Sequence, residues 1–218
     1  MRDRPQPAST LSAGNRYSGN RTNRHGTLSN STPHEFDLEL PRGDLWIFGY
    51  GSLMWNPGFS YARSCSALLR GYHRTFCVYS SRYRGTPEQP GLVLGLNRGG
   101  ACRGIAYLVA QSQIEIALES LWVREMSRRT YLPRLVHVAL AGECVQALAF
   151  IADPCHPSYA GRLPLEEVAA LITRSAGSRG ANIEYLVNTL RHLEEAGVRD
   201  SRLRLIHGAV EKLLARRR

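Results

Sequence analysis

The pattern of apolar and polar positions divides the chain into a polar head, a β-rich middle and a helical end. From Asp44 onward, runs rich in β-branched and aromatic residues are separated by Gly and Pro, which is typical of strands joined by turns. Because Pro133 cannot donate an amide hydrogen, its run is predicted to be an edge strand or to contain a bulge. The predicted strands are 45–50, 70–80, 91–97, 102–109, 131–140 and 144–152.

Helical periodicity appears first between the fourth and fifth predicted strands. There apolar residues recur at steps of three and four, which predicts a helix with one apolar face formed by Ile114, Leu118, Leu121 and Trp122. Beyond residue 152 the pattern is helical, with glycines between the segments. Strands with one inserted helix, followed by a helical end, favour an α+β fold over a doubly wound sheet. The predicted helical segments are 163–176, 182–197 and 201–217.

Length and composition agree with one globular domain preceded by a tail. The chain has 218 residues, of which 43% are hydrophobic and 21% charged, and this length does not require two domains. Residues 1–40 are poor in apolar side chains, so they are predicted to form a disordered tail, and residues 41–218 a single domain. The tail lacks the apolar stretch of a secretory signal, although its Arg and Ser content resembles a transit peptide. No apolar run approaches the length that crosses a bilayer.

The net charge of +10 is concentrated at the two ends of the chain. Residues 1–34 contain five arginines and one aspartate, and residues 199–218 contain seven basic and two acidic side chains. Residues 35–198 contain sixteen basic and fifteen acidic side chains and are almost neutral. A domain that binds nucleic acid usually carries its positive charge on the folded face that docks. The distribution therefore disfavours a nucleic-acid or protein interaction module, which stays the alternative from another class.

The five cysteines are predicted to be buried free thiols in a reducing cytoplasm. They show no C-x-x-C pair and no zinc-finger spacing with histidines, so no metal site is predicted. Cys155 is followed by His156, but the prolines on either side predict a turn. The cysteines are Cys65, Cys77, Cys102, Cys144 and Cys155.

Residues 46–53, WIFGYGSL, contain the most informative motif. An apolar strand-like run ends abruptly at Tyr50, Gly51, Ser52 and Leu53, and backbone amides at a tight glycine turn can bind an anion. A plain strand-to-loop turn is the simpler interpretation. Ser52 is not predicted to be a hydrolase nucleophile, because the G-x-S-x-G motif is absent and no base can be assigned to it.

Glu125 is the candidate acid–base residue. It follows Leu121 by four positions, so it is predicted to lie on or beside the apolar helix face, near the C-terminal end. Burial and the negative end of the helix dipole both raise a carboxyl pKa, which suits a general base that later returns its proton. The alternative is an ion pair with Arg124, Arg128 or Arg129.

Arg82 and Arg84 precede a Gly-Thr-Pro turn. Arginine side chains bind carboxylates through two parallel hydrogen bonds, so the pair is a candidate for recognising an acidic group. A solvated hairpin tip explains the pattern equally well.

Six segments, taken in order, resemble the ChaC-type γ-glutamylcyclotransferases: FGYGSLMW, RGYHRTF, RGTPEQPG, CRGIAYLV, LWVRE and GANIEYL. The likeness extends from about Leu45 to about Leu214. It implies a mixed α/β cyclotransferase fold built around a small barrel-like sheet. It also implies the release of 5-oxoproline and cysteinylglycine from glutathione, without a metal or organic cofactor. The family's reaction on other γ-glutamyl amino acids or amines stays open as the second substrate class.

The resemblance also assigns roles to individual residues. The loop from Tyr50 to Leu53 would bind the γ-glutamyl group, Glu125 would be the essential acid, and Tyr185 would lie near the substrate. Arg84 is assigned to a substrate carboxylate from chemistry and position alone. The chain reads R-E-M where many members have a small or charged residue after R-E, so the geometry at the helix exit is expected to differ.

Overall fold

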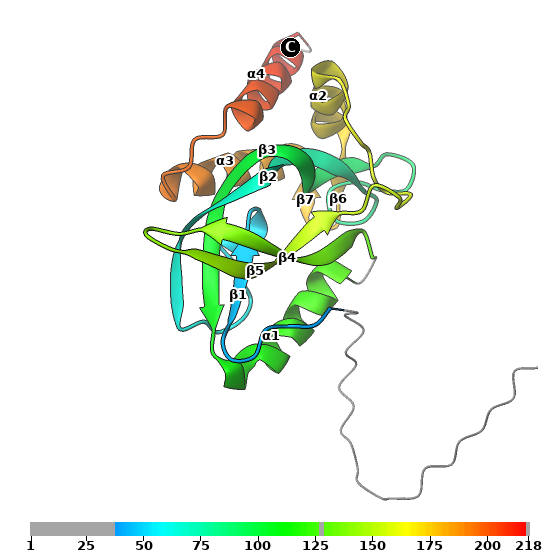
Figure 1. Cartoon of the computed structure of the whole chain (residues 1–218). Coiled ribbons are helices and arrows are strands. Elements are labelled where there is room, and N and C mark those ends of the chain that lie inside the picture. Colours follow the sequence, from blue (N-terminus) through cyan, green and yellow to red (C-terminus); the bar gives the residue numbers. More distant parts are fainter. Residues whose placement is uncertain (1–37, 127–128, 217–218) are drawn as a thin grey trace, which may run out of the picture. The chain divides into compact units, whose positions relative to one another are not determined.

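The computed structural model describes residues 38–126 and 129–216 of the chain (Figure 1). Residues 1–37, which make up most of the predicted tail, lie outside the described residues. The expected disorder of the tail and the proposed domain boundary at residue 41 therefore stay predictions.

The centre of the described fold is a closed barrel of five strands in the order β1-β3-β2-β4-β5. Neighbouring strands are antiparallel, except that β1 and β5 pair in parallel and close the barrel. The predicted α+β fold with a small barrel-like sheet is confirmed. The strands are β1 (Leu45–Gly49), β2 (Arg63–Ser80), β3 (Gly91–Val109), β4 (Tyr131–Ala139) and β5 (Cys144–Ala152).

Strand β1 is buried on both faces because its side chains alternate between two hydrophobic cores. Leu45 and Ile47 pack with the apolar face of helix α1 (Ile114–Leu121). Phe48 packs in the larger core, which the C-terminal helices share. The strand is therefore fixed from both sides just before the turn that follows it.

Strands β2 and β3 form one long hairpin that the sequence predicted only in part. Strand β2 begins at Arg63, before its predicted start, and the two runs predicted at 91–97 and 102–109 are one continuous strand. Gly99 and Gly100, between these two runs, have φ angles of 94° and 72°. The pairing with β2 shifts register at this point. Here the glycines bend the hairpin around the barrel instead of ending the strand.

Strands β4 and β5 agree with the predicted runs to within one residue. At Pro133, β4 pairs with β5 alone, because its pairing with β2 is confined to Val138 and Ala139. Pro133 therefore lies in an edge stretch, where its missing amide hydrogen breaks no bond between strands. This confirms the edge-strand prediction.

Three helices follow the barrel and lie on the side where β2 and β3 bend (Figure 1). Each predicted helical segment is confirmed, although each helix is shorter than the pattern indicated. Asp200 caps the last helix, and its carboxylate accepts a hydrogen bond from the amide of Leu203 at 3.1 Å. No helix in the described part of the chain has the length and hydropathy that a membrane span requires. The helices are α2 (Leu165–Arg174), α3 (Asn182–Glu195) and α4 (Ser201–Ala215), and a small ribbon of β6 (Ala176–Gly177) and β7 (Gly180–Ala181) precedes α3.

The cysteines are free thiols, as predicted, but not all are buried. Burial raises the pKa of Cys77 to about 12 and that of Cys102 to about 11. Cys144 and Cys155 are exposed, so the prediction of burial is wrong for these two. Cys144 is the first residue of β5 and Cys155 lies in a turn, and both positions are open to solvent.

Candidate active site

The turn after β1 and the exit of helix α1 meet at a narrow space of about 40 Å³, which we call the inner chamber. It is lined by all the candidate site residues predicted from the sequence except Arg82 and Arg84. The turn after β1, the segment that follows α1, strands β3, β4 and β5, and a later helix contribute residues, so the closed barrel brings distant parts of the chain together. The lining residues are Tyr50, Gly51, Ser52, Leu53, Leu94, Glu125, Tyr131, Phe150 and Tyr185.

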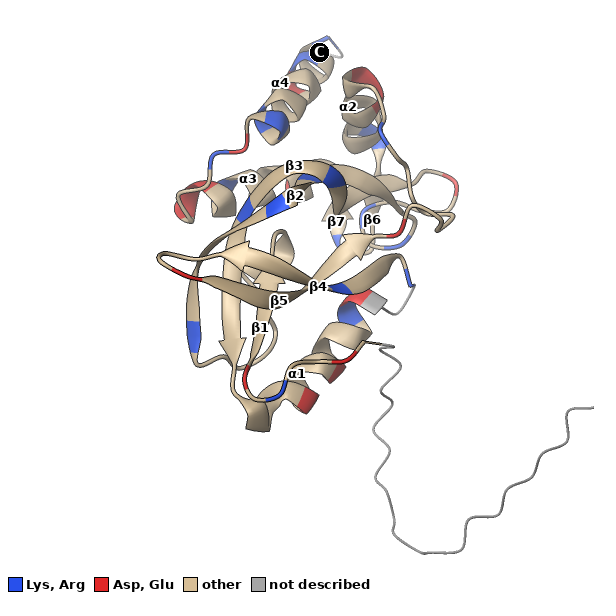
Figure 2. Cartoon of the chain, in the orientation of Figure 1, with Lys and Arg blue, Asp and Glu red and all other residues tan. Residues whose placement is uncertain are grey.

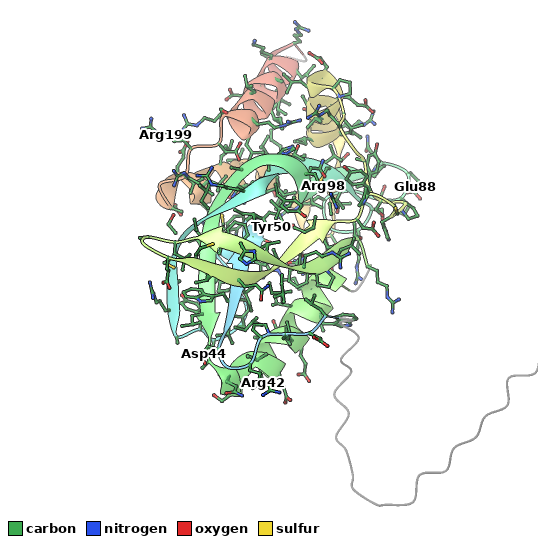
Figure 3. The ribbon with its side chains drawn as sticks, in the orientation of Figure 1. Arg42, Asp44, Tyr50, Glu88, Arg98 and Arg199 are labelled. Carbon is green, nitrogen blue, oxygen red and sulfur yellow. The ribbon has the colours of Figure 1, made fainter. Side chains whose placement is uncertain are left out.

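Tyr50 is fixed at both its hydroxyl and its carbonyl. The hydroxyl donates to the carbonyl of Phe150 on β5 at 2.8 Å, and the carbonyl accepts from Nε of the buried Arg74. Figure 3 shows Tyr50 in the middle of the fold, far from the peripheral Arg42 and Asp44. Burial raises the pKa of Tyr50 well above its ordinary value, so it is a neutral phenol that holds the turn against the barrel.

The chain after Tyr50 makes a single 3₁₀ turn, Ser52–Met54. The amide of Met54 donates to the carbonyl of Gly51 at 2.8 Å. Amides at the N-terminal end of a helical turn have no acceptor within that turn, and the residues that carry them line the inner chamber. A Cβ atom added to Gly51 would lie 3.9 Å from the hydroxyl of Tyr185, inside the space open to a ligand. That these amides bind an anion stays a prediction, and the turn places the residues that carry them at the chamber.

Glu125 lies in a π-helical turn, Trp122–Met126, that directly follows α1. Wide helical turns of this kind are frequent at functional sites. The Glu125 side chain is 16% exposed, and its Oε1 lies 3.3 Å from Nε of Arg124. Burial raises the pKa of Glu125 above its ordinary value, and Arg124 offsets part of this rise. The ion pair and the desolvated carboxyl, predicted as alternatives, are therefore present together.

Arg124 connects the turn that carries Glu125 to the turn that follows β1. Its Nη2 donates to Oγ of Ser52 at 2.6 Å, and its Nη1 donates to the carbonyl of Asn56 at 2.5 Å. The guanidinium of Arg124 therefore fixes the position of one turn relative to the other. The Ser52 hydroxyl accepts a hydrogen bond from a cation, which agrees with the prediction that it is not a nucleophile.

Tyr131 and Tyr185 complete the chamber opposite the turn. The Tyr131 hydroxyl donates to the carbonyl of Leu94 at 2.8 Å. Burial, with Glu125 nearby, raises the pKa of Tyr131 well above its ordinary value, and burial raises that of Tyr185 to about 12. Both are neutral phenols at physiological pH. Sequence reasoning missed Tyr131, because an aromatic residue at the start of a strand is also an ordinary core residue.

Asn182 positions Tyr185 by pairing the start of α3 with β3. Its fully buried side chain accepts from the amide of Leu92 and donates to the carbonyl of Leu92, both at 2.7 Å. The side chain thus forms with Leu92 the same kind of paired hydrogen bonds that the backbone of a neighbouring strand would form. Because Tyr185 lies one helical turn later, this pairing fixes its distance from the barrel. The GANIEYL segment contains both residues, but the sequence did not predict the structural role of Asn182.

Arg84 lies outside the inner chamber, in a wider cavity of about 570 Å³ that we call the outer cavity. The two spaces share Ser52, Glu125, Tyr131 and Tyr185. The Arg84 guanidinium lies 5.4 Å from the centre of the Tyr185 ring. The outer cavity has the size of an ordinary small-molecule site, so the narrow chamber suits the reacting end of a ligand and the outer cavity suits the remainder.

Residues 38–126 and 129–216 contain no group of three or more His, Cys, Asp and Glu arranged to hold a metal ion. That the protein works without a metal or organic cofactor stays a prediction.

The raised pKa of Glu125 predicts that its ionisation lowers the stability of the fold. Because the folded chain binds this proton more tightly than the unfolded chain, stability falls as pH rises from the ordinary carboxyl value of about 4.3 through the raised pKa. We expect Glu125→Gln to raise the melting temperature at about pH 7.5 and to change it little at about pH 4. Thermal unfolding of both proteins across this range measures the effect. A difference that does not grow with pH would contradict the raised pKa.

A closed mixed barrel, whose first strand ends in a glycine turn opposite a partly buried carboxyl, defines the γ-glutamylcyclotransferase-like class of folds. A solved yeast structure described as a γ-glutamyl cyclotransferase specific to glutathione has this fold, with a TM-score of 0.72 over 78% of this chain and 96% of the yeast chain, at 22% identity. Residues 45–213 match the ChaC-like protein family. The chain belongs to this family, which confirms the resemblance seen in the sequence.

Two relatives with curated names are similar over most of their lengths. The glutathione-specific γ-glutamylcyclotransferase of Escherichia coli (strain K12) is 41% identical over 174 residues, covering 79% of this chain and 75% of the bacterial protein. The glutathione-specific γ-glutamylcyclotransferase 1 of Danio rerio is 42% identical over 156 residues, covering 69% of this chain and 80% of the fish protein.

Proposed function

We propose that this chain is a glutathione-specific γ-glutamylcyclotransferase. The observation that carries the proposal is the position of Glu125, a carboxyl with a raised pKa, in the inner chamber lined by the turn from Tyr50 to Leu53. The names of its relatives support glutathione as the substrate.

The reaction needs no nucleophile from the protein, because the α-amine of the substrate attacks its own γ-carbonyl. One carbon–nitrogen bond forms and closes a five-membered ring, and the bond to the cysteinyl nitrogen breaks. Two protons leave the attacking ammonium and two reach the departing nitrogen, so no other reactant is consumed. Holding the amine and the carbonyl in contact can supply about 7 kcal/mol or more of the barrier. A narrow chamber is suited to this task.

Glu125 transfers protons between the two nitrogens. Its carboxylate accepts a proton from the α-ammonium, and the resulting acid donates it to the departing nitrogen of cysteinylglycine. A raised pKa brings the carboxyl nearer to the working pH, at which both steps are favourable. Arg124 keeps the ionised form accessible through its contact at 3.3 Å.

The amides of the turn and the Tyr185 phenol stabilise the charge on the substrate. Gly51 and Ser52 present amides to the α-carboxylate or to the γ-carbonyl oxygen. The Tyr185 hydroxyl lines the same chamber, whereas the Tyr131 hydroxyl already donates to Leu94. Donors placed where negative charge develops act strongly in a site that excludes water, and the loss of one typically costs about 3 kcal/mol.

The outer cavity favours glutathione over small γ-glutamylamines, because it gives room for a dipeptide beyond the reacting bond. A cytoplasmic location belongs to the same proposal, since glutathione keeps thiols reduced in that compartment.

In the view of Figure 2, Lys and Arg residues of the described chain are spread over strands, helices and loops. This spread does not favour the interaction-module alternative.

Incubation of the purified protein with glutathione tests the function. We expect 5-oxoproline and cysteinylglycine to appear in equal amounts, and turnover of γ-glutamylalanine to be lower by at least about tenfold, a factor worth about 1.4 kcal/mol. Chromatography of both products measures the rates. Equal turnover of the two substrates would favour the broader γ-glutamyl specificity, and the absence of 5-oxoproline from both would exclude the activity.

A further inference from the structure

The outer cavity contains more positive charge than its acidic neighbours balance. Arg124 is bound to Glu125 and Ser52, Arg191 lies 4.0 Å from Glu195, and Arg84 lies 3.9 Å from Glu184. In the described lining, Glu125 is the one acidic residue. The arginines of the lining are Arg82, Arg84, Arg124, Arg179 and Arg191.

Arg179 is held in place by the backbone around it. The amide of Ser178 donates to the carbonyl of Arg82 at 2.9 Å, and the amide of Arg179 donates to the carbonyl of Tyr83 at 3.0 Å. Gly177 packs so closely here that an added Cβ would lie 2.6 Å from the Tyr83 carbonyl carbon. The guanidinium carbons of Arg179 and Arg82 consequently lie 4.2 Å and 5.4 Å from the centre of the Tyr83 ring. The ring orients both cations toward the cavity that all three residues line.

Neither Arg179 nor Arg82 forms an ion pair with a described residue. Burial lowers the pKa of Arg84, and repulsion from the nearby positive charge of Arg179 lowers it further. Assembling like charges costs free energy that a bound anion relieves. Because guanidinium groups match the shape of carboxylates, a ligand carboxylate is the group that this arrangement fits.

The cations lie along a path that leads outward from the inner chamber. Tyr185 lines the chamber, and the Arg84 guanidinium lies 5.4 Å from the centre of its ring. A Cβ added to Gly180 would lie 3.4 Å from Nη1 of Arg84, so the turn with Arg179 comes next. The cysteinylglycine part of glutathione extends about 7 Å, at about 3.5 Å per residue. Its terminal carboxylate therefore points toward this end of the outer cavity when the γ-glutamyl group occupies the chamber.

We propose that Arg179, stacked on Tyr83 with Arg82 beside it, binds the glycine carboxylate of glutathione and selects the tripeptide over other γ-glutamyl compounds. This proposal rests on the proposed function. Because the contact is remote from the reacting bond, it is present in the bound substrate and in the transition state alike. Its loss raises KM more than it lowers kcat.

Steady-state kinetics on glutathione and on its glycine monoethyl ester, which neutralises only this carboxylate, tests the proposal. We expect the parent protein to show kcat/KM lower for the ester by about 10- to 100-fold, the range for a lost hydrogen bond to a charged group. Arg179→Gln is expected to lower kcat/KM for glutathione by a similar factor, through KM, and to leave the value for the ester unchanged. Cysteinylglycine is expected to inhibit the parent protein more strongly than the variant.

Arg134→Gln is the matched control, because Arg134 is an exposed arginine on β4 that lines neither space. It removes the same charge and is expected to leave both substrates unaffected. The proposal is overturned if Arg179→Gln lowers kcat/KM equally for both substrates, or if the parent protein uses the ester as well as glutathione. A parent protein that forms no 5-oxoproline from either substrate contradicts the proposed function itself, whereas both results that overturn the carboxylate contact require an active parent protein.

Discussion

Glu125→Gln is expected to lower kcat for 5-oxoproline formation from glutathione by about 10²- to 10⁴-fold, the contribution typical of a positioned general base. The amide keeps the size of the side chain but cannot accept the proton of the α-ammonium. The inner chamber offers no second described carboxyl to replace it. Single-turnover formation of 5-oxoproline, followed over hours, measures a residual rate of this size.

Glu119→Gln supplies the control, because Glu119 is an exposed carboxyl on α1, the helix that directly precedes the turn with Glu125. Its turnover is expected to equal that of the parent protein. Since Glu125→Gln is also expected to be more stable at neutral pH, a loss of activity cannot be attributed to unfolding. Parental turnover in the Glu125 variant would remove this residue from the mechanism.

Arg74→Met is expected to destabilise the fold by about 3–5 kcal/mol, the usual cost of breaking a buried ion pair by removing one partner. Arg74 is 3% exposed, and its Nη1 lies 3.0 Å from Oδ2 of Asp200. It also donates to the carbonyls of Tyr50 and Arg103. Methionine fills similar space but leaves a partly buried carboxylate and two carbonyls without these donors. Equilibrium unfolding in urea measures the difference.

Arg70→Met, at an exposed arginine of the same strand, tests whether the effect depends on burial. A change within about 0.5 kcal/mol is expected there, as for most surface substitutions. Equal losses in the two variants would show that the contacts of Arg74 contribute little. Because Arg74 touches the backbone of the active-site turn and the cap of α4, its loss is also expected to reduce activity in the fraction that stays folded.

The sequence predicted those parts of the site that reside in one short segment. The turn from Tyr50 to Leu53 and the acid at Glu125 each stand out locally, one as glycines after an apolar strand and the other as a carboxyl beside an apolar helix face. The approximate positions of the helices and strands followed from the same local periodicity, although β2 begins earlier and the C-terminal helices are shorter than predicted. The sequence predicted two strands separated at Gly99 and Gly100, where the structure has one bent strand. A glycine pair is compatible with a turn or with a bulge, and the pairing with the neighbouring strand determines which of them forms.

The parts that the sequence did not predict depend on contacts between distant segments. Arg74 and Asn182 are polar residues that have apolar neighbours in the sequence. Their side chains could equally be exposed to solvent, and only their distant partners show that they are buried. Asp200 accepts the hydrogen bond of Arg74 from 126 residues away along the chain. Tyr131, the first residue of β4, joins the chamber through the barrel, where its hydroxyl donates to the carbonyl of Leu94 on β3. Such roles follow from strand register, which local patterns do not specify.

The parallel closure of β1 on β5 has a consequence for the order in which the protein matures. Trp46 pairs with Ala147, and the Tyr50 hydroxyl bonds to a carbonyl 100 residues further on. Contacts between residues that are so far apart in the sequence raise the contact order of the fold and slow folding. During synthesis the turn from Tyr50 to Leu53 leaves the ribosome well before β5, so the nascent chain carries an unpaired strand edge through that interval. A chain that ends before β5 therefore lacks part of the lining of the chamber, which includes Phe150 and Tyr185.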